Sequence, residues 1–276
     1  MMSRIGSRVM IPDLDSDWVR RFTGEAAPLV REGEFETWIV YEDEHVIALN
    51  KPGWLVCHPS KQGPMSSLVG AADLYLKQER LHLVSRLDRE TSGIVLIAKH
   101  RKSAGQYQKA IEQKRVKKTY VVWLIGELKE AVDVNQPLAR DIESEVYIKQ
   151  TVRKSNSAQS ARTRFEPLHY DPASNLSVVK VLPVTGRKHQ IRAHAKWLGY
   201  PVYGDKLYGP DDRCYLEFIE KGWTTALAEK LVFPRQALHA VSLQFEGVEY
   251  QPDFTAPLTP DLLTLNARIG YAGETK

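Results

Sequence analysis

The 276-residue sequence has few cysteines and no long apolar run, and both absences exclude whole protein classes. Its two cysteines, Cys57 and Cys214, are far apart and form no C-x-x-C pair. Two cysteines in a chain of this length are too few for a disulfide framework, so we expect reduced thiols that bind no metal. No apolar run approaches the ~20 residues that span a bilayer, and the first residues lack the apolar segment of a signal peptide. We therefore expect a cytoplasmic protein with no membrane partner.

An excess of charge of one sign is also missing. The sequence holds 38 lysines and arginines against 34 acidic residues, which gives a formal net charge of +4. Apolar residues make up 43% and charged residues 26%, a balance that excludes a largely disordered chain. The mild basic bias permits nucleic-acid binding without arguing for it.

A polar stretch, residues 85–93, is followed directly by the apolar run 94–98. The run is short and rich in β-branched residues, so it predicts a buried strand that begins after a polar loop. In the loop, Asp88 lies between Arg86 and Arg89, and nearby cations favour the charged form of a carboxylate. Gly93 permits a tight backbone turn into the strand. The pattern suits a catalytic loop, and on spacing alone it equally suits a surface ion-pair cluster beside an ordinary turn.

Further segments alternate between strand and helix patterns without a regular βαβ series, which predicts an α+β domain. The expected strands are 38–41 and 45–49 as a hairpin, 120–125, 161–165 antiparallel to 176–182, and 238–245. The expected helices are 67–80, one capped by Ser103 and running to about Lys114, one ending near Leu198, and two short ones within 210–235 separated near Gly222. The tail from Asp253 is an exit punctuated by prolines, with no helix or strand assigned to it.

Three sequence motifs resemble those of one known enzyme family. They are Arg86-Leu87-Asp88-x-x-Thr91-Ser92-Gly93, then Lys118-x-Tyr120 at the start of a strand, then Gly186-Arg187-x-His189-Gln190-Ile191-Arg192-x-His194. In this order they resemble the RluA-like family of RNA pseudouridine synthases, and the resemblance covers roughly residues 38–256. Two departures are Ser85, where the family often has histidine, and Glu246-Gly247, where it usually has His-Pro.

The resemblance implies a fold and a reaction. The fold is a mixed, mostly antiparallel sheet with flanking helices and a central RNA-binding cleft. The reaction isomerises specific uridines in structured RNA, ribosomal or transfer, to pseudouridine. The N1–C1′ bond breaks, the uracil turns, and C5 joins C1′ without cofactor or redox change. The base must leave its helix, because C1′ and C6 are inaccessible inside a stack.

The resemblance also assigns roles to individual residues. Asp88 is the catalytic residue, Tyr120 packs on the target uracil, and Arg192 pairs with Asp88. Arg86 fills the space that the flipped base vacates. Asp88 acts either as a nucleophile or as a base toward the ribose, and both roles need the same ionised carboxylate. The residues expected to bind RNA are Arg86, Arg89, Lys118, Arg187, Lys188 and His189.

A basic stretch, residues 99–118, lies close to these motifs, and only Glu112 opposes its cations. Most charge runs are simply solvated helix faces, but beside an RNA site this run is better interpreted as neutralising phosphates. Lys51 and His58 are expected to be structural or peripheral RNA contacts. Residues 1–34 are an N-terminal extension too short for an S4-type RNA-binding domain, and residues 35–276 form the catalytic domain of an expected monomer.

The sequence also bears on three other functions. His189 and His194 are five residues apart with no carboxylate or cysteine between them, so no metal site is expected. A non-catalytic RNA-binding protein on the same scaffold would have lost Asp88, Tyr120 or Arg192. A hydrolase that uses Asp88 with His189 remains an alternative, although the sequence has no Gly-x-Ser-x-Gly nucleophile elbow.

Overall fold

The computed structural model describes Arg21, residues 28–58 and residues 62–273. The predicted extension 1–34 therefore lies mostly outside the described residues. Within residues 28–34, the side chain of Val30 is buried in the main core, and its backbone N–H donates to the carbonyl of Met65 at 2.8 Å. Among the described residues, no helix is long and apolar enough to cross a membrane.

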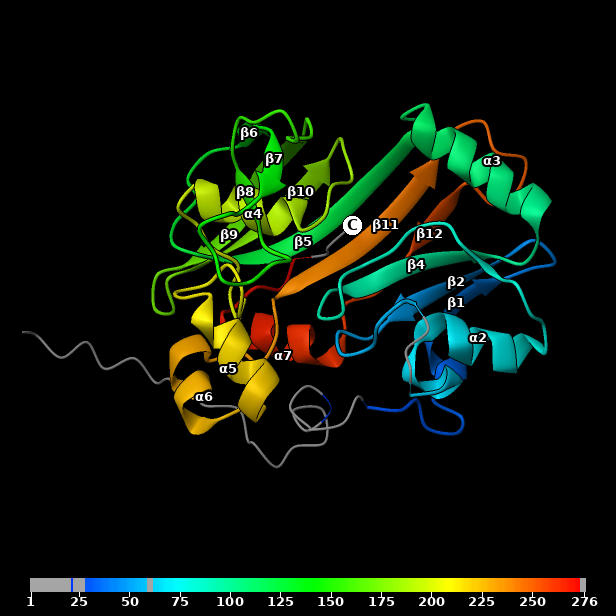
Figure 1. Cartoon of the computed structure of the whole chain (residues 1–276), viewed down its shortest axis with the longest axis horizontal. Helices are drawn as coiled ribbons and strands as arrows, with labels where there is room; N and C mark the ends of the chain where they lie inside the picture. The colour runs from blue at the N-terminus through cyan, green and yellow to red at the C-terminus, as the bar shows by residue number, and fades with distance from the viewer. Residues whose placement is uncertain (1–20, 22–27, 59–61, 274–276) are drawn as a thin grey trace, which may run out of the picture.

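One large mixed sheet runs through the molecule (Figure 1). Its strands in spatial order are β1 (Ile39–Glu42), β2 (Val46–Lys51), β4 (Ser92–Ala98), β11 (Leu238–Phe245), β5 (Val116–Ile125), β10 (Leu176–Pro183), β9 (Arg162–Asp171) and β6 (Val132–Asn135). β12 (Asp253–Thr255) pairs with β11, and β3 (His82–Leu83) pairs with β4. β7 (Leu138–Arg140) and β8 (Gln150–Val152) form a separate small sheet. The pairs within the large sheet are antiparallel except β4 with β11, so the predicted α+β class and mostly antiparallel sheet are confirmed.

Helices flank the sheet. They are α2 (Leu68–Leu76), α3 (Arg101–Glu112), α4 (Gln190–Trp197), α5 (Arg213–Lys221), α6 (Thr225–Leu231) and α7 (Pro260–Arg268). Two short 3-10 helices, η1 (Phe35–Trp38) and η2 (Pro64–Ser66), precede β1 and α2. Figure 1 places α2 and α3 beside the β1–β4 half of the molecule, and α4 to α6 beside the other half.

Most of the expected elements are confirmed, two details were wrong, and two elements were not predicted. The predicted hairpin, the antiparallel pair β9–β10 and the two helices separated near Gly222 are all present. Ser103 does not cap α3, because His100 holds the N-cap position and the Ser103 hydroxyl donates to the carbonyls of His45 and His100. The first helix ends at Leu76, since Lys77 takes a left-handed backbone conformation. The tail from Asp253, to which the sequence assigned no element, contains β12 and α7.

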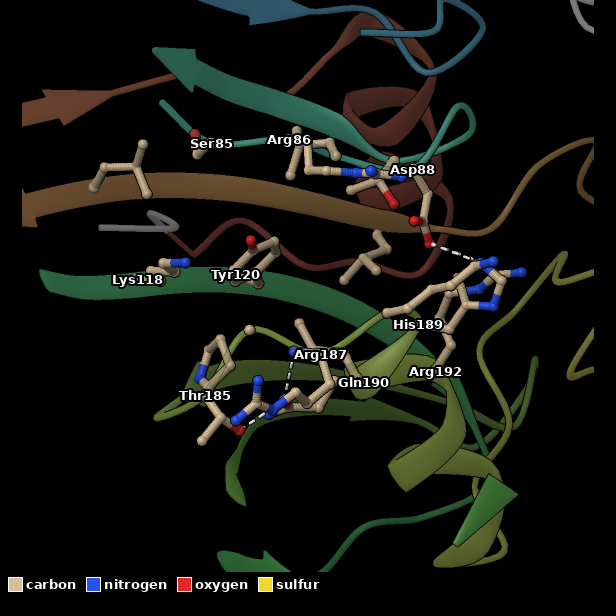
Figure 2. A pocket seen from close by; sticks show the side chains of 18 of the residues that line it. Ser85, Arg86, Asp88, Lys118, Tyr120, Thr185, Arg187, His189, Gln190 and Arg192 are labelled. Atoms are coloured by element: carbon tan, nitrogen blue, oxygen red, sulfur yellow. Dashed lines mark hydrogen bonds and ion pairs between the residues drawn. The ribbon is translucent and has the colours of Figure 1, made fainter. Parts of the chain in front are cut away.

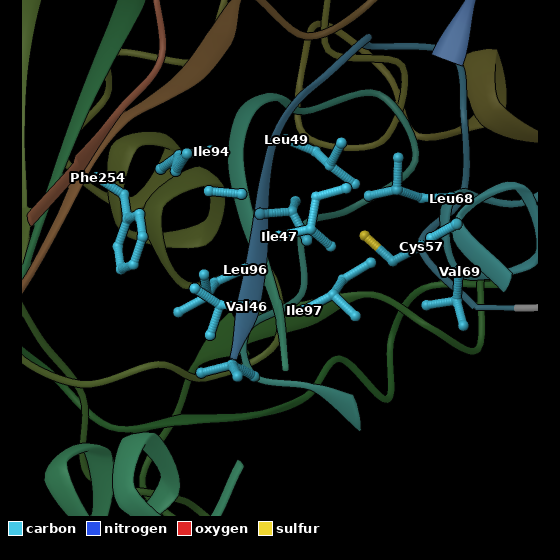
Figure 3. Close-up of a cluster of buried hydrophobic side chains, with 14 of the residues drawn as sticks. Val46, Ile47, Leu49, Cys57, Leu68, Val69, Ile94, Leu96, Ile97 and Phe254 are labelled. Atoms are coloured by element: carbon cyan, nitrogen blue, oxygen red, sulfur yellow. The ribbon is translucent and has the colours of Figure 1, made fainter. Parts of the chain in front are cut away.

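The main hydrophobic core lies on β2 and β4 (Figure 3). Every residue of β4 is buried, so this strand shows none of the alternation of a half-exposed strand. Deleting a side chain such as that of Leu96 from such a core typically costs about 2–5 kcal/mol. The loop that carries Asp88 leads directly into this strand, so the core gives it a rigid base.

The sheet register brings the three motifs together. Gly93 on β4 pairs with Ala240 on β11, which pairs with Tyr120 on β5, which pairs with Val181 on β10. The segment after β10 holds the third motif. Motifs far apart in the sequence therefore meet at one place, because neighbouring strands put their residues in a single row across the sheet.

Candidate active site

The Asp88 loop (residues 85–92) connects β3 to β4, and buried cations hold its backbone. The ammonium group of Lys51 donates to the carbonyl of Arg89 at 3.0 Å, and also to the carbonyls of Pro52 and Leu55. A guanidinium nitrogen of Arg235 donates to the carbonyl of Glu90 at 3.1 Å. Burial lowers the pKa of Lys51 to about 8. Both side chains are fully buried, so their positions are set by packing and fix those carbonyls.

Side chains of the Asp88 loop are held as well. The carboxylate of Glu90 accepts from Lys206 at 2.7 Å, and the hydroxyl of Thr91 accepts from Gln236 at 2.7 Å. The N–H of Thr91 donates to the carbonyl of Asp88 at 3.1 Å and closes a turn. The Asp88 side chain is thus presented from a preorganised loop, which is what precise positioning requires.

Gly93, which follows the loop, has a φ of 110°. A Cβ atom at this position would lie 2.1 Å from the carbonyl oxygen of Ala240 on β11. The predicted tight turn at Gly93 is wrong, because Gly93 lies inside β4. Its role is to permit the close approach of β11 and a backbone conformation that other residues rarely adopt.

Arg192 bridges two carboxylates. Its Nη1 donates to Oδ2 of Asp88 at 3.0 Å, while Nε and Nη2 donate to Oδ2 and Oδ1 of Asp205 at 2.6 and 2.8 Å. Asp205 is fully buried and also accepts from the N–H groups of Leu207 and Tyr208. The predicted pair between Arg192 and Asp88 is present, but the two-pronged contact is made to Asp205. Asp205 clamps the guanidinium, and the guanidinium in turn positions Asp88.

The environment keeps Asp88 ionised. Burial alone would raise the pKa of its carboxyl, but His189 and Arg192 together lower it below the ordinary value of 3.8. The pKa of His189 is itself lowered to about 4, mainly by burial and then by Arg192, so this ring is neutral at neutral pH. The charge that stabilises the Asp88 carboxylate is therefore that of Arg192. Arg86 and Arg89, its neighbours in sequence, make no ion pair with it among the described residues.

Two residues of β5 face the same space as Asp88. Figure 2 shows Tyr120 on β5 between the Asp88 loop and the segment that carries Arg187 and Arg192, with Lys118 further along the strand. Lys118 and Tyr120 are two residues apart, so they share one face of the strand. Burial raises the pKa of Tyr120 and lowers that of Lys118. Tyr120 therefore stays a neutral phenol, which offers a flat ring and a hydroxyl donor.

The Arg192 segment (residues 185–192) is held by Gln190. The amide oxygen of Gln190 accepts from the Thr185 hydroxyl at 2.7 Å and from the Arg187 N–H at 3.0 Å, and its amide nitrogen donates to Thr163 at 2.9 Å. His189 begins α4 with a φ of 55°, and its Nδ1 lies 3.0 Å from the Tyr208 hydroxyl. Gln190 thus fixes the turn that presents the basic residues of this segment.

His189 and His194 lie in different surroundings and contact different residues. The ring nitrogens of His194 lie 2.8 Å from the Thr163 hydroxyl and 3.0 Å from the carbonyl of Gln136. Both nitrogens are occupied in the interior, so His194 anchors α4 to β9. His189 instead faces Asp88, with Nε2 at 3.9 Å from Oδ2.

A cavity of about 410 Å³ opens between the Asp88 loop, β5, β11 and the Arg192 segment. Figure 2 shows the side chains that line it. They include eight of the nine predicted site residues: Arg86, Asp88, Lys118, Tyr120, Arg187, Lys188, His189 and Arg192. Arg89 is the exception, since its Nε donates to the carbonyl of Trp54 at 3.3 Å and it lines an adjoining cavity.

Sequence reasoning missed the residues that support the site. Asp205 and Arg235 receive no role from the sequence motifs, and Lys51 is expected there only to be structural or a peripheral RNA contact. Two features of the sequence could have identified these residues. One is an aspartate in a turn, where its carboxylate can accept hydrogen bonds from backbone N–H groups. The other is a charged residue inside an otherwise apolar segment. Their partners lie far away in sequence, so no local pattern identifies them.

The arrangement of charged and aromatic side chains around the cavity indicates a class of protein. An ionised carboxylate faces a neutral tyrosine ring inside a cleft rimmed by arginine and lysine. This arrangement suits an enzyme that acts on a base of a polyanion, because cations neutralise phosphates and aromatic rings stack on bases.

Comparisons with known proteins identify the family. The model of the RNA pseudouridylate synthase family matches residues 45–197. The chain is 30% identical over 266 residues to a protein named ribosomal large subunit pseudouridine synthase C from Vibrio vulnificus, covering 96% of this chain and 76% of that protein. It is 35% identical over 195 residues to a Mycoplasma pneumoniae protein named as an uncharacterized RNA pseudouridine synthase, covering 70% of this chain and 62% of that protein.

A solved structure agrees on the fold. The human RNA pseudouridylate synthase domain containing 1 superposes with a TM-score of 0.66 at 23% identity, over 84% of this chain and 89% of that chain. The chain belongs to the RNA pseudouridylate synthase family and is an enzyme that converts uridine in RNA to pseudouridine.

Proposed function

We propose that Asp88 is the catalytic carboxylate of this pseudouridine synthase, with Arg192 positioning it and Tyr120 packing on the target uracil. The observation that carries the proposal is the chain Asp205–Arg192–Asp88, with contacts of 2.6 and 3.0 Å. The Asp88 side chain is 29% exposed, against 8% for Arg192 and 0% for Asp205. The outermost carboxylate of the chain is thus the one that a substrate in the cavity can reach.

The remaining cleft residues suit a flipped nucleotide. Arg86 is exposed, lines the cavity and makes no ion pair with a described residue. A long cation at this place fits a side chain that fills the gap left by an extruded base, and Lys118, Arg187 and Lys188 can contact the flanking phosphates. Flipping costs a few kcal/mol, which stacking and phosphate contacts offset.

The chemistry needs a carboxylate and no exogenous reagent. The N1–C1′ bond breaks, the uracil rotates, and a C5–C1′ bond forms. The proton leaves C5 and N1 gains one, so the atoms balance. Asp88 contributes either as a nucleophile or as a base toward the ribose, and the geometry serves both. Tyr120, kept neutral by its raised pKa, supplies a flat face and a proton donor beside the reacting base.

The proposed substrate is ribosomal RNA, with transfer RNA as the alternative. The name of the Vibrio vulnificus relative, which assigns that protein to the large ribosomal subunit, supports this order. We further propose that the enzyme acts as a monomer in the cytoplasm, with residues 35–276 as its catalytic domain. The two free, buried thiols of Cys57 and Cys214 support a reducing compartment, since they form no disulfide.

The test is tritium release from RNA labelled at uridine C5, with ribosomal and transfer RNA in separate reactions. We expect release from one pool with the wild-type enzyme and none with Asp88→Asn, because the amide cannot act as nucleophile or base. Asp88→Asn should still bind the RNA in a filter assay, which distinguishes lost chemistry from lost folding. Normal release from Asp88→Asn would overturn the assignment.

A further inference from the structure

A second cavity, of about 560 Å³, lies next to the active-site cavity. The two share Arg86, Asp88, Lys188, His189 and Arg192 as lining residues. They therefore meet at the Asp88–Arg192 pair. Anything that occupies the second cavity while uridine occupies the first lies beside the reacting base.

The outer wall of the second cavity is apolar and aromatic. Tyr215, Phe218 and Ile219 line it from α5, and Ile148 lines it from the loop before β8. The three α5 residues have the i, i+3, i+4 spacing that places them on one helix face. Ile219 is 64% exposed, so this wall carries apolar surface that the fold leaves open.

The charged residues of the cavity are mostly cations. Arg86 and Lys188 are exposed at its rim, and neither makes an ion pair with a described residue. Glu90 also lines the cavity, but its carboxylate is paired with Lys206 at 2.7 Å. The rim therefore favours an anionic ligand, while the wall favours a flat apolar group.

We infer that this second cavity binds the base of a nucleotide adjacent to the target uridine in a single-stranded stretch of RNA. The inference rests on the proposed function, since it places the target uridine in the first cavity. A base would pack against Tyr215 and Ile219, while its phosphate lies near Lys188. Stacking of this kind tolerates any base, and the Tyr215 hydroxyl, which makes no hydrogen bond to a described residue, adds a group that can read a base edge.

The experiment uses short RNAs in which 2-aminopurine lies directly 5′ or directly 3′ of a single uridine. Its fluorescence falls when the base stacks, so binding to the second cavity is seen without turnover. We expect quenching in one of the two positions with wild-type enzyme. The variant is Ile219→Glu, because this exposed side chain contributes little to folding and the new carboxylate repels the phosphate.

The matched control is Leu216→Glu on the same helix, whose side chain does not line the cavity. We expect Ile219→Glu to lower the affinity for the RNA, measured by quenching, by roughly tenfold, which is the order of one lost base stack. Leu216→Glu should leave it unchanged. No quenching in either position, or equal weakening by both variants, would overturn the inference.

Tritium release, measured in parallel, separates this inference from the proposed function. Tritium release without quenching would overturn the inference that the second cavity binds a base, and it would leave the proposed function intact. Quenching without release supports a base-binding cavity while removing the catalytic assignment. Asp88→Asn should retain the quenching, because its substitution leaves the α5 wall intact.

Discussion

At the scale of single residues, the geometry of the site depends most on Arg192. It lies between a buried carboxylate, Asp205, and a partly exposed one, Asp88. A guanidinium can contact both at once because its donors point in several fixed directions. The Asp205 contact fixes where the guanidinium lies, and this fixes the carboxylate that we propose reacts.

We predict that Arg192→Lys is not conservative. A lysine has one nitrogen, so it cannot keep the two-pronged contact to Asp205 and still reach Asp88. Losing charge-assisted hydrogen bonds of about 1.5–3 kcal/mol each should slow a single turnover at least tenfold, as measured by tritium release. Asp205→Asn is the companion variant, expected to lose rate while Asp88 itself is intact. Near-normal turnover by both would contradict the role of the clamp.

The pH dependence tests the same network. The pKa of Asp88 is lowered below 3.8, so the carboxylate stays ionised until the pH falls through that lower value. The pKa of His189 is about 4, so its ring does not gain a proton near pH 6.5 either. We expect the single-turnover rate to be flat between about pH 5 and 7.

Arg192→Met provides the comparison for this profile. Without the guanidinium, burial raises the pKa of Asp88, so the acid limb of the rate profile should move to higher pH. An inflection near pH 6.5 in the wild-type profile would instead indicate that His189 titrates during the reaction, against the expectation.

At the scale of elements, the parallel pairing of β4 with β11 decides the position of the Asp88 loop. Arg235, just before β11, donates to the carbonyl of Glu90 in the Asp88 loop and to the hydroxyl of Ser92 on β4. It also pairs with Asp261 of α7 at 2.6 Å. The helix α7 therefore stabilises the Asp88 loop through one buried arginine. Breaking a buried pair of this kind leaves an uncompensated charge, which is strongly destabilising.

The close approach of these strands is testable at Gly93. Gly93→Ala places a Cβ 2.1 Å from the carbonyl of Ala240 and keeps a φ of 110° that alanine disfavours. Backbone strain of this type costs about 1–3 kcal/mol, and the clash adds to it. We expect a lower midpoint of urea unfolding with an unchanged slope.

Gly105→Ala is the matched control for that measurement. Gly105 lies within α3, and a Cβ there meets no atom within 4 Å. Alanine is about 1 kcal/mol more favourable than glycine in a helix, so this variant should be as stable as the wild type or more stable. Equal urea midpoints for the two glycine variants would contradict a close approach of β11 to Gly93.

At the scale of the whole molecule, the mild net charge conceals an uneven distribution. Arg101, Lys102, Lys109 and Lys114 are exposed on or just after α3, and none of them makes an ion pair with a described residue. Ile111 of the same helix lines the active-site cavity, and Figure 1 shows α3 near the ends of β5 and β11. This group of cations extends the basic rim of the cleft.

We predict that Lys109→Gln and Lys114→Gln together reduce the salt dependence of RNA binding. Each neutralised phosphate contributes about 0.9 to the slope of log K against log salt, so the double variant should lower it by about 2. Lys129→Gln is the control, because Lys129 pairs with Glu127 beyond the other end of β5. An unchanged slope in the double variant would show that α3 lies outside the RNA path.

Local pattern predicted most of the elements, whereas the resemblance of the three motifs to a known family named the cavity residues. The hairpin, the buried run 94–98, the long β9–β10 pair and the strand 238–245 all follow from apolar periodicity and turn residues. The predicted helix cap was wrong at Ser103, because its hydroxyl forms a tertiary hydrogen bond to the carbonyl of His45. The helix α7 was missed because its apolar pattern is short and begins directly at Pro260.

The sequence by itself determined the order of the three motifs and, through their resemblance to a known family, the family and the reaction. Only the tertiary structure decided that Arg192 grips Asp205 with two donors and Asp88 with one, and that Lys51 and Arg235 hold the Asp88 loop from below. The physical reason is distance along the chain. Helix and strand periods report only near neighbours, whereas the charge partners of a buried ion are chosen by packing of remote elements.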